Sequence, residues 1–173
     1  MKVVYYLAVS LDGFIADEDG GVDWLDELAI DHENTGYDTF YADIDGLIMG
    51  RATYDFVHNY GQWPYGDQPT WVCTTRELST LEGCNLQQGN DPRSAIANAS
   101  SMGLNSVWVV GGGVLASALL TNGLLSHISV SVMPIILGRG IKIFDQLPNH
   151  VQLIQEHSTP MSGFTQIEYR VGQ

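Results

Sequence analysis

Three consecutive glycines, Gly111, Gly112 and Gly113, follow an apolar run typical of a buried strand and precede a run of helix-forming residues. Glycine offers no side chain to pack and adds backbone entropy that folding must remove, so three together need an explanation. At the start of a helix the main-chain N–H groups lack partners and the helix dipole favours negative charge. Without side chains in the way, a phosphate can approach this backbone. The triplet predicts either an anion site or a tight turn with close strand–helix packing, and the glycines alone favour neither.

Two further segments place hydrogen-bond donors directly after a predicted strand. Their residues are Gly50, Arg51, Thr53, Thr74, Thr75 and Arg76. Arginine presents a planar fork of donors that suits a phosphate group. The chain has only seven Lys and Arg residues, so two arginines at strand ends are not the pattern of scattered surface charge. Three such junctions fit an extended anion with several phosphates, such as a phosphorylated dinucleotide.

The order of the elements predicts a sheet that gathers these junctions. Apolar, β-rich runs alternate with helical stretches up to residue 120, and the tail has strands without helices between them. We expect strands at 2–9, 46–50, 69–75, 85–89, 106–110, 127–138, 151–157 and 164–171, and helices at 35–42, 51–60, 92–102 and 114–120. This pattern is typical of an α/β fold with a mostly parallel central sheet, helices on both faces and an antiparallel C-terminal edge. Ligands of such sheets bind beyond the carboxyl ends of the strands.

Composition narrows the functional class. The 173 residues suit one domain, residues 1–173, and the net charge of −13 argues against binding to nucleic acid or to an anionic membrane. No apolar run is long enough to span a bilayer, and we expect a cytoplasmic protein. Cys73 and Cys84 lack metal-ligand or disulfide-framework spacing, the five histidines are dispersed, and we expect no metal. No GxSxG nucleophile motif occurs either.

The ordered motifs AVSLDGFIA, LIMGRATYD, VCTTR, VVGGGVLASALL and SVMPIILGRGIKIF resemble the dihydrofolate reductase-like superfamily. The resemblance covers nearly the whole chain. It is closest to the branch that contains the reductase domain of bacterial riboflavin biosynthesis, the RibD C-terminal domain. The PxxLGxGxxxF segment separates this branch from ordinary dihydrofolate reductases. The resemblance implies an NADPH-dependent reductase, and the branch commonly forms homodimers.

The resemblance also implies which residues bind the cofactor. They are Ala8 and Ile15 beside the nicotinamide, Gly50, Arg51 and Thr53 along the pyrophosphate and adenosine, Thr74, Thr75 and Arg76 around the 2′-phosphate, and Gly111, Gly112, Gly113, Val114 and Leu115 at the pyrophosphate. It implies, in addition, a cis peptide bond between Gly111 and Gly112. At the 2′-phosphate, donors and cations favour the phosphorylated cofactor, although Glu77 and the acidity of the chain oppose this preference.

The substrate side is less defined. Ordinary dihydrofolate reductases hold the pterin with a carboxylate on the first helix, but spacing selects none of Asp26, Asp31 and Glu33. Asp12 and Asp31 remain catalytic candidates, and Asp12, Trp24 and Ser131 are the candidates for substrate binding. Two of them have a structural alternative: Asp12 beside Gly13 is suited to making a turn, and Trp24 is suited to fixing its loop against the core.

These residues predict hydride transfer from NADPH to a small pterin-, folate- or pyrimidine-like heterocycle. The acidic segment ADEDGGVDWLDE would repel a phosphorylated substrate, so a neutral or cationic one is favoured. Two alternatives stay open, an ordinary dihydrofolate reductase and a protein that binds NADPH or a pterin without turnover.

Overall fold

The computed structural model describes residues 1–31, 35–87 and 89–172. An eight-stranded sheet runs through the molecule in the order β5-β4-β3-β6-β1-β7-β10-β9. Its strands are β1 (Lys2–Ser10), β3 (Gly46–Gly50), β4 (Thr70–Cys73), β5 (Leu86–Gln87), β6 (Ser106–Val110), β7 (His127–Met133), β9 (Leu153–Pro160) and β10 (Thr165–Val171). The strands from β5 to β7 are parallel, and β10 and β9 complete an antiparallel edge, as the sequence predicts.

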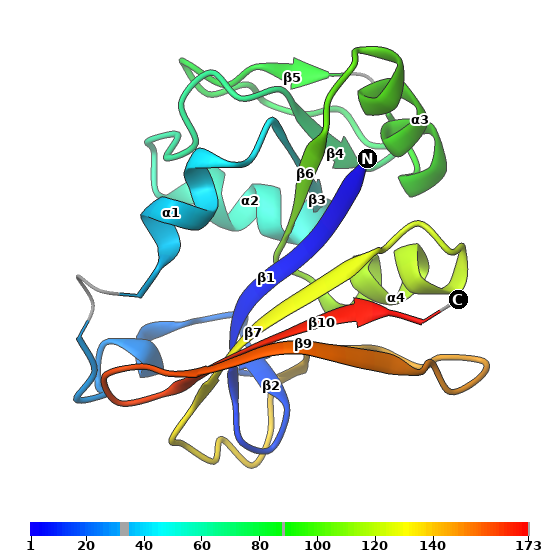
Figure 1. Ribbon diagram of the computed structural model, residues 1–173. Coiled ribbons are helices and arrows are strands. Elements are labelled where there is room, and N and C mark those ends of the chain that lie inside the picture. The colour runs from blue at the N-terminus through cyan, green and yellow to red at the C-terminus, as the bar shows by residue number, and fades with distance from the viewer. Residues whose placement is uncertain (32–34, 88, 173) are drawn as a thin grey trace.

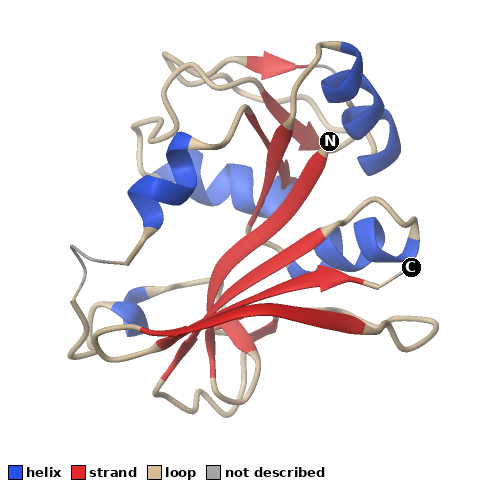
Figure 2. Cartoon of the chain, in the orientation of Figure 1, coloured by secondary structure: helices blue, strands red, loops and turns tan. Residues whose placement is uncertain are grey.

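Helices cover both faces of this sheet (Figures 1 and 2). They are α1 (Tyr37–Ala42), α2 (Arg51–Asn59), α3 (Pro92–Ser101) and α4 (Gly113–Thr121), with a 3₁₀ turn η1 (Asp23–Leu25). One face packs against α3 and α4 through small and aliphatic residues, and the other packs against α1 and α2 through an aromatic cluster around Trp108. The predicted α/β architecture is confirmed.

Local sequence signals account for several boundaries. Asp91 caps α3 by accepting from the N–H groups of Arg93 and Ser94, at 2.9 and 3.0 Å, and Pro92 opens the helix. The predicted strand 127–138 is too long: β7 ends at Met133, because Pro134 cannot donate to a sheet ladder. A short pair that the sequence did not predict, β2 (Phe14–Ala16) with β8 (Ile141–Lys142), lies apart from the main sheet.

Two consequences follow for the site. The parallel strands β4, β3, β6 and β1 all end on the same side of the sheet, which brings the segments that follow them together. Over the described residues, no helix is both long and apolar enough to cross a membrane.

Candidate functional site

The three predicted junctions come together at one edge of the sheet. Neighbouring strands are in register there, with Gly50 of β3 opposite Cys73 of β4 and Met49 opposite Val110 of β6. A cleft of about 880 Å³ opens beyond these strand ends. Its lining includes the predicted residues Ile15, Gly50, Arg51, Thr53, Gly111, Gly112, Gly113, Val114 and Leu115. Segments far apart in the sequence thus line one cleft.

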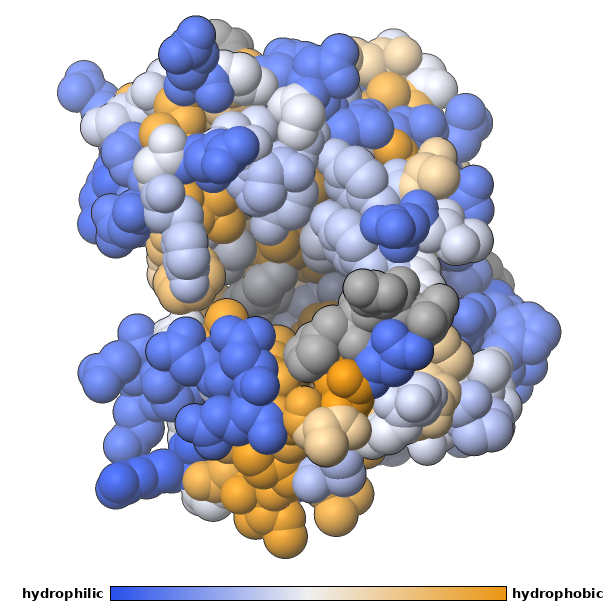
Figure 3. Space-filling model, turned by 90° about the vertical axis from the view of Figure 1, so that its left-hand side faces the viewer, coloured by the Kyte–Doolittle hydropathy of each residue, from blue (hydrophilic) through white to orange (hydrophobic). Residues whose placement is uncertain are grey.

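Figure 3 shows the surface hollowed across the middle of the molecule. The part that carries α1 and α2 lies above the hollow, and hydrophobic residues gather below it. The acidic segment after β2 contributes Glu18 and Asp19 to the lining of the cleft, so negative charge borders one side of the opening.

The glycine triplet forms the turn from β6 into α4. Gly111 and Gly112 have positive φ angles of 74° and 24°, and Gly112 is the N-cap of the helix. The predicted cis peptide bond between them is wrong, because the described residues contain no cis bond. Gly112 has no side chain to accept from the first-turn N–H groups of α4, which leaves the helix N-terminus to face the cleft.

The triplet also packs closely against its neighbours. A β-carbon on Gly111 would overlap the side chain of Thr53, and one on Gly113 would overlap the carbonyl oxygen of Lys142. The turn is therefore tight, and its bare backbone borders a cleft, while the anion site stays a prediction.

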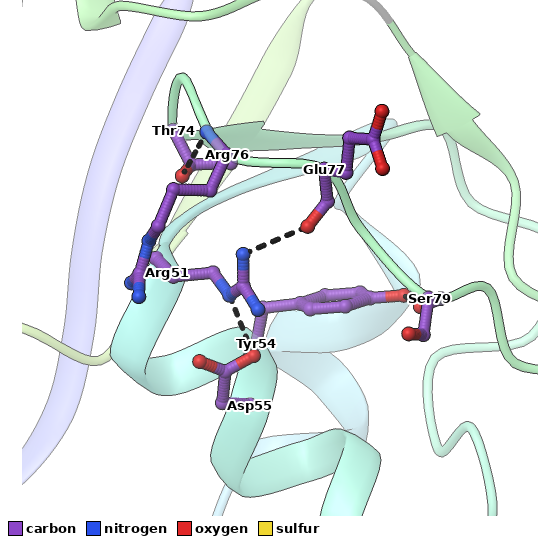
Figure 4. Close-up of polar contacts among 7 residues, drawn as sticks. All are labelled: Arg51, Tyr54, Asp55, Thr74, Arg76, Glu77 and Ser79. Atoms are coloured by element: carbon purple, nitrogen blue, oxygen red, sulfur yellow. Dashed lines mark hydrogen bonds and ion pairs between the residues drawn. The ribbon is translucent and has the colours of Figure 1, made fainter.

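Arg51 is fixed at the adenosine-side junction of the predicted site (Figure 4). Its Nε lies 2.6 Å from Asp55 Oδ1, one helical turn along α2, and its Nη1 donates to the carbonyl of Glu77 at 2.9 Å. The N–H of Arg76 donates to Thr74 Oγ1 at 3.2 Å, which makes a local turn. Figure 4 shows the Arg76 side chain extending toward the start of α2, where the Arg51 side chain begins, while the Arg51 guanidinium points toward Asp55 and Glu77.

Some predicted cofactor residues do not line the cleft. Thr74, Thr75 and Arg76 lie beside it, after β4, and Ala8 packs with the hydrophobic cluster around Trp24. Cys73 does line it, and burial raises the pKa of its thiol to about 12, with a smaller contribution from Asp91. At neutral pH this group is a thiol rather than a nucleophilic thiolate.

Asp12 has a structural position. Its carboxylate accepts from Ser10 Oγ at 2.7 Å and from the N–H groups of Leu137 and Gly138 at 3.1 and 2.7 Å. The bond from Ser10 is the main reason why its pKa lies below the ordinary value. These contacts join the end of β1 to the segment after β7, so Asp12 has a structural role, although it links two distant segments rather than making a local turn beside Gly13.

The other substrate candidates lie apart from the cleft lining. Trp24 is buried with Met133 and Phe164, and its indole N–H has no acceptor within the described part of the chain. Ser131 is buried and donates its hydroxyl to Gln166 Oε1. The main-chain N–H of Asp31 donates to the carbonyl of Ser162 at 3.3 Å. Glu33 lies outside the described residues.

A second cavity, of about 590 Å³, lies on the sheet face shared by β1, β7 and β10. Tyr6 and Phe40, whose rings stack 4.0 Å apart, form part of its wall, together with Gln166 and Glu168. The Gln166 Nε2 also donates to Ser129 Oγ at 2.7 Å, so its amide is held at both ends. Sequence reasoning missed Gln166 and Glu168, because no local motif marks them on β10.

The comparisons with known proteins agree with this architecture. The family described as RibD C-terminal domain matches residues 1–166. The chain belongs to that family. "Uncharacterized protein YwjB" of Bacillus subtilis is 32% identical over 169 residues, which cover 97% of each chain.

Solved structures of other proteins have a similar fold. A "Putative riboflavin biosynthesis protein" from Shewanella sp. PV-4 superposes with a TM-score of 0.87 at 29% identity over 100% of both chains. The riboflavin biosynthesis reductase Rib7 of Saccharomyces cerevisiae superposes with a TM-score of 0.64 at 14% identity, over 99% of this chain and 90% of that one. The resemblance to the RibD C-terminal branch is thereby confirmed, and the family supports a reductase-like function. Among the described residues, no cluster of three or more His, Cys, Asp or Glu side chains could hold a metal ion.

Proposed function

We propose that this chain is a reductase that binds NADPH in the 880 Å³ cleft and transfers hydride to a small heterocyclic compound. One observation carries the proposal. Three strand-end junctions with phosphate-binding chemistry line or border one cleft, although they lie far apart in the sequence. An anion site of a single turn would not need such an extended arrangement.

The residues present fit this cofactor. The bare backbone at Gly112 and Gly113, with the α4 N-terminus behind it, would hold the pyrophosphate. A side chain at Gly111 would overlap Thr53, so that part of the site accepts only a glycine. Arg51 and Arg76 would face the 2′-phosphate, and Ile15 on β2 would pack beside the nicotinamide.

When bound, the cofactor supplies the hydride. The chain orients the cofactor ring through Ile15 and Ala16 and excludes water with the apolar lining of the cleft. Burial raises the pKa of Cys73, so this group would line the cleft as a thiol rather than as a nucleophilic thiolate. The acidic residues Glu18 and Asp19 at the cleft favour a neutral or cationic substrate over a phosphorylated one.

A direct test measures binding and turnover separately. Isothermal calorimetry with NADPH and NADH should give saturable binding at one site per chain. Absorbance at the reduced-nicotinamide band, followed across pterins, flavin precursors and aminopyrimidines, should then detect oxidation with at least one compound class. Binding without oxidation across this panel would favour the alternative of a cofactor-binding protein. Failure to bind either cofactor would contradict the proposal.

We also propose that the chain forms a homodimer through β9. All eight residues of this strand are exposed, although it lies at the edge of the sheet and includes Leu153 and Ile154. An open edge strand with apolar side chains promotes uncontrolled pairing unless another chain covers it.

A cytoplasmic location agrees with the free thiols of Cys73 and Cys84.

A further inference from the structure

The guanidinium of Arg51 is already engaged before any cofactor arrives. Its five N–H groups are one at Nε and two at each Nη. Asp55 takes the Nε position through a 2.6 Å ion pair, and the carbonyl of Glu77 takes one Nη1 position at 2.9 Å. Within the described part of the chain, the remaining three N–H groups have no acceptor. A phosphate could therefore meet Arg51 only at its Nη1 and Nη2 end.

The second arginine of this region has a different environment. Arg76 is exposed, and among the described residues it forms no ion pair with a carboxylate. Its side chain extends from the loop after β4 toward the start of α2 (Figure 4). Each guanidinium group could stabilise an anion bound beside it. Asp55 is the carboxylate that reaches Arg51, and it balances that charge from the α2 side only.

We propose that Asp55 determines how strongly the site selects the 2′-phosphorylated cofactor, by holding Arg51 in place while neutralising part of its charge. This inference rests on the proposed function and adds a residue that limits the preference for NADPH over NADH. The side chains of Arg51 and Asp55 are 24% and 43% exposed. Solvent and salt therefore weaken the electrostatic effect of Asp55 on a bound phosphate, but they do not remove it. A dianionic phosphate beside Arg51 would be repelled by Asp55 at short range.

The decisive variant is Asp55→Asn. Asparagine has nearly the same shape and its Oδ1 can still accept from Arg51 Nε, so the position of the guanidinium is preserved while the negative charge is removed. We expect NADPH to bind about three- to tenfold more tightly to this variant. This is the effect expected from removing one negative charge that lies several ångström from the phosphate and is partly screened by solvent. NADH lacks the 2′-phosphate and should change by less than about twofold.

Two controls separate charge from geometry. Asp55→Ala removes both the charge and the hydrogen bond, so it should give a smaller gain than Asp55→Asn, because Arg51 is no longer held. Asp38→Asn, on the exposed first turn of α1, changes the net charge equally and should leave the ratio of the two affinities unchanged. A half-buried i, i+4 helix ion pair contributes little to folding, so circular dichroism should show all three variants folded.

The outcomes are distinct. A higher NADPH-to-NADH affinity ratio for Asp55→Asn than for wild type, with Asp38→Asn unchanged, supports the inference. Binding of both cofactors with an unchanged or lower ratio for Asp55→Asn overturns it and leaves the proposed function intact. Binding of neither cofactor to the wild type overturns both. Calorimetry at 50 mM and 300 mM salt adds a second readout, since the gain should shrink at the higher ionic strength.

Discussion

Thr53 on α2 occupies the space that a side chain on Gly111 would need. A β-carbon at Gly111 would overlap both the hydroxyl and the methyl group of Thr53, and the φ of 74° at Gly111 is itself unfavourable for other residues. The junction after β3 and the junction after β6 are thus packed directly against each other, and the spacing across the cleft depends on this contact.

Gly111→Ala should therefore destabilise the fold. The left-handed conformation and the overlap with Thr53 together should reduce the free energy of unfolding by about 2–4 kcal/mol, measured by urea denaturation. Thr53→Ala in the same chain removes the two overlapping atoms and should recover part of this loss. If Gly111→Ala unfolds at the same urea concentration as the wild type, the turn is not as tight as described.

Gly112→Asp tests the anion site rather than the turn. A β-carbon at Gly112 meets only Thr53 Oγ1, at 3.9 Å, so there is room for a side chain despite the φ of 24°. The carboxylate would stand at the N-terminus of α4, where the pyrophosphate is proposed to bind, and should abolish NADPH binding in a folded protein. Gly112→Asn carries the same strain without the charge and should bind more tightly than Gly112→Asp. Equal affinities for wild type and Gly112→Asp would make the loop purely structural.

Those features of the fold and of the candidate site that are controlled by neighbouring residues could be predicted from the sequence. The Asp91 cap, Pro92 and the glycine triplet lie within a few residues of what they control, and the elements around them were predicted correctly. The cleft also followed, because parallel strands end on one side of a sheet regardless of their order. The i, i+4 spacing of Arg51 and Asp55 was visible as well, and could have been noted as a helix ion pair.

Contacts between residues far apart in the sequence could not be predicted, because no local pattern marks them. Ser131 reaches Gln166 only because β10 runs antiparallel to β7 in a register that places them opposite each other. Asp12 binds the main chain of Gly138, which no spacing rule connects to it. The cis bond was inferred from resemblance alone, and the described residues contain none.

The bonds to Asp12 should make stability depend on pH. Its pKa in the folded chain lies below the ordinary value of 3.8, chiefly through the bond from Ser10. A group with a lowered folded pKa stabilises the fold above the unfolded pKa, and the stabilisation is lost as pH falls through the folded value. Asp12→Asn should lower the melting temperature at pH 7, and the difference from wild type should shrink below about pH 3.8. A constant difference from pH 7 to pH 2.5 would show that the charge of Asp12 contributes nothing.

Assembly through β9 predicts a mass of twice the 19.0 kDa chain mass in light scattering at micromolar concentration. Ile154→Arg places a charge on this exposed strand and should shift the mass toward the monomer. Ile136→Arg changes an equally apolar and more exposed residue outside β9, so it should leave the dimer intact. A monomeric wild type would contradict the proposed assembly, and equal effects of the two variants would place the interface elsewhere.

Arg76 provides the last test, because it is the cation at the proposed 2′-phosphate site that no carboxylate of the described residues engages. A charge-assisted contact to phosphate contributes roughly 1.5–3 kcal/mol in favourable settings, and the exposure of Arg76 places it at the lower end. Arg76→Ala should weaken NADPH binding by about tenfold and leave NADH binding nearly unchanged. Quenching of tryptophan fluorescence, followed in separate titrations with NADPH and NADH, measures both affinities. Arg93→Ala is the matched control, since Arg93 donates to Asn122 Oδ1 and does not line the cleft. Equal losses for the two cofactors in Arg76→Ala would mean that this arginine acts on the fold of the loop rather than on the phosphate.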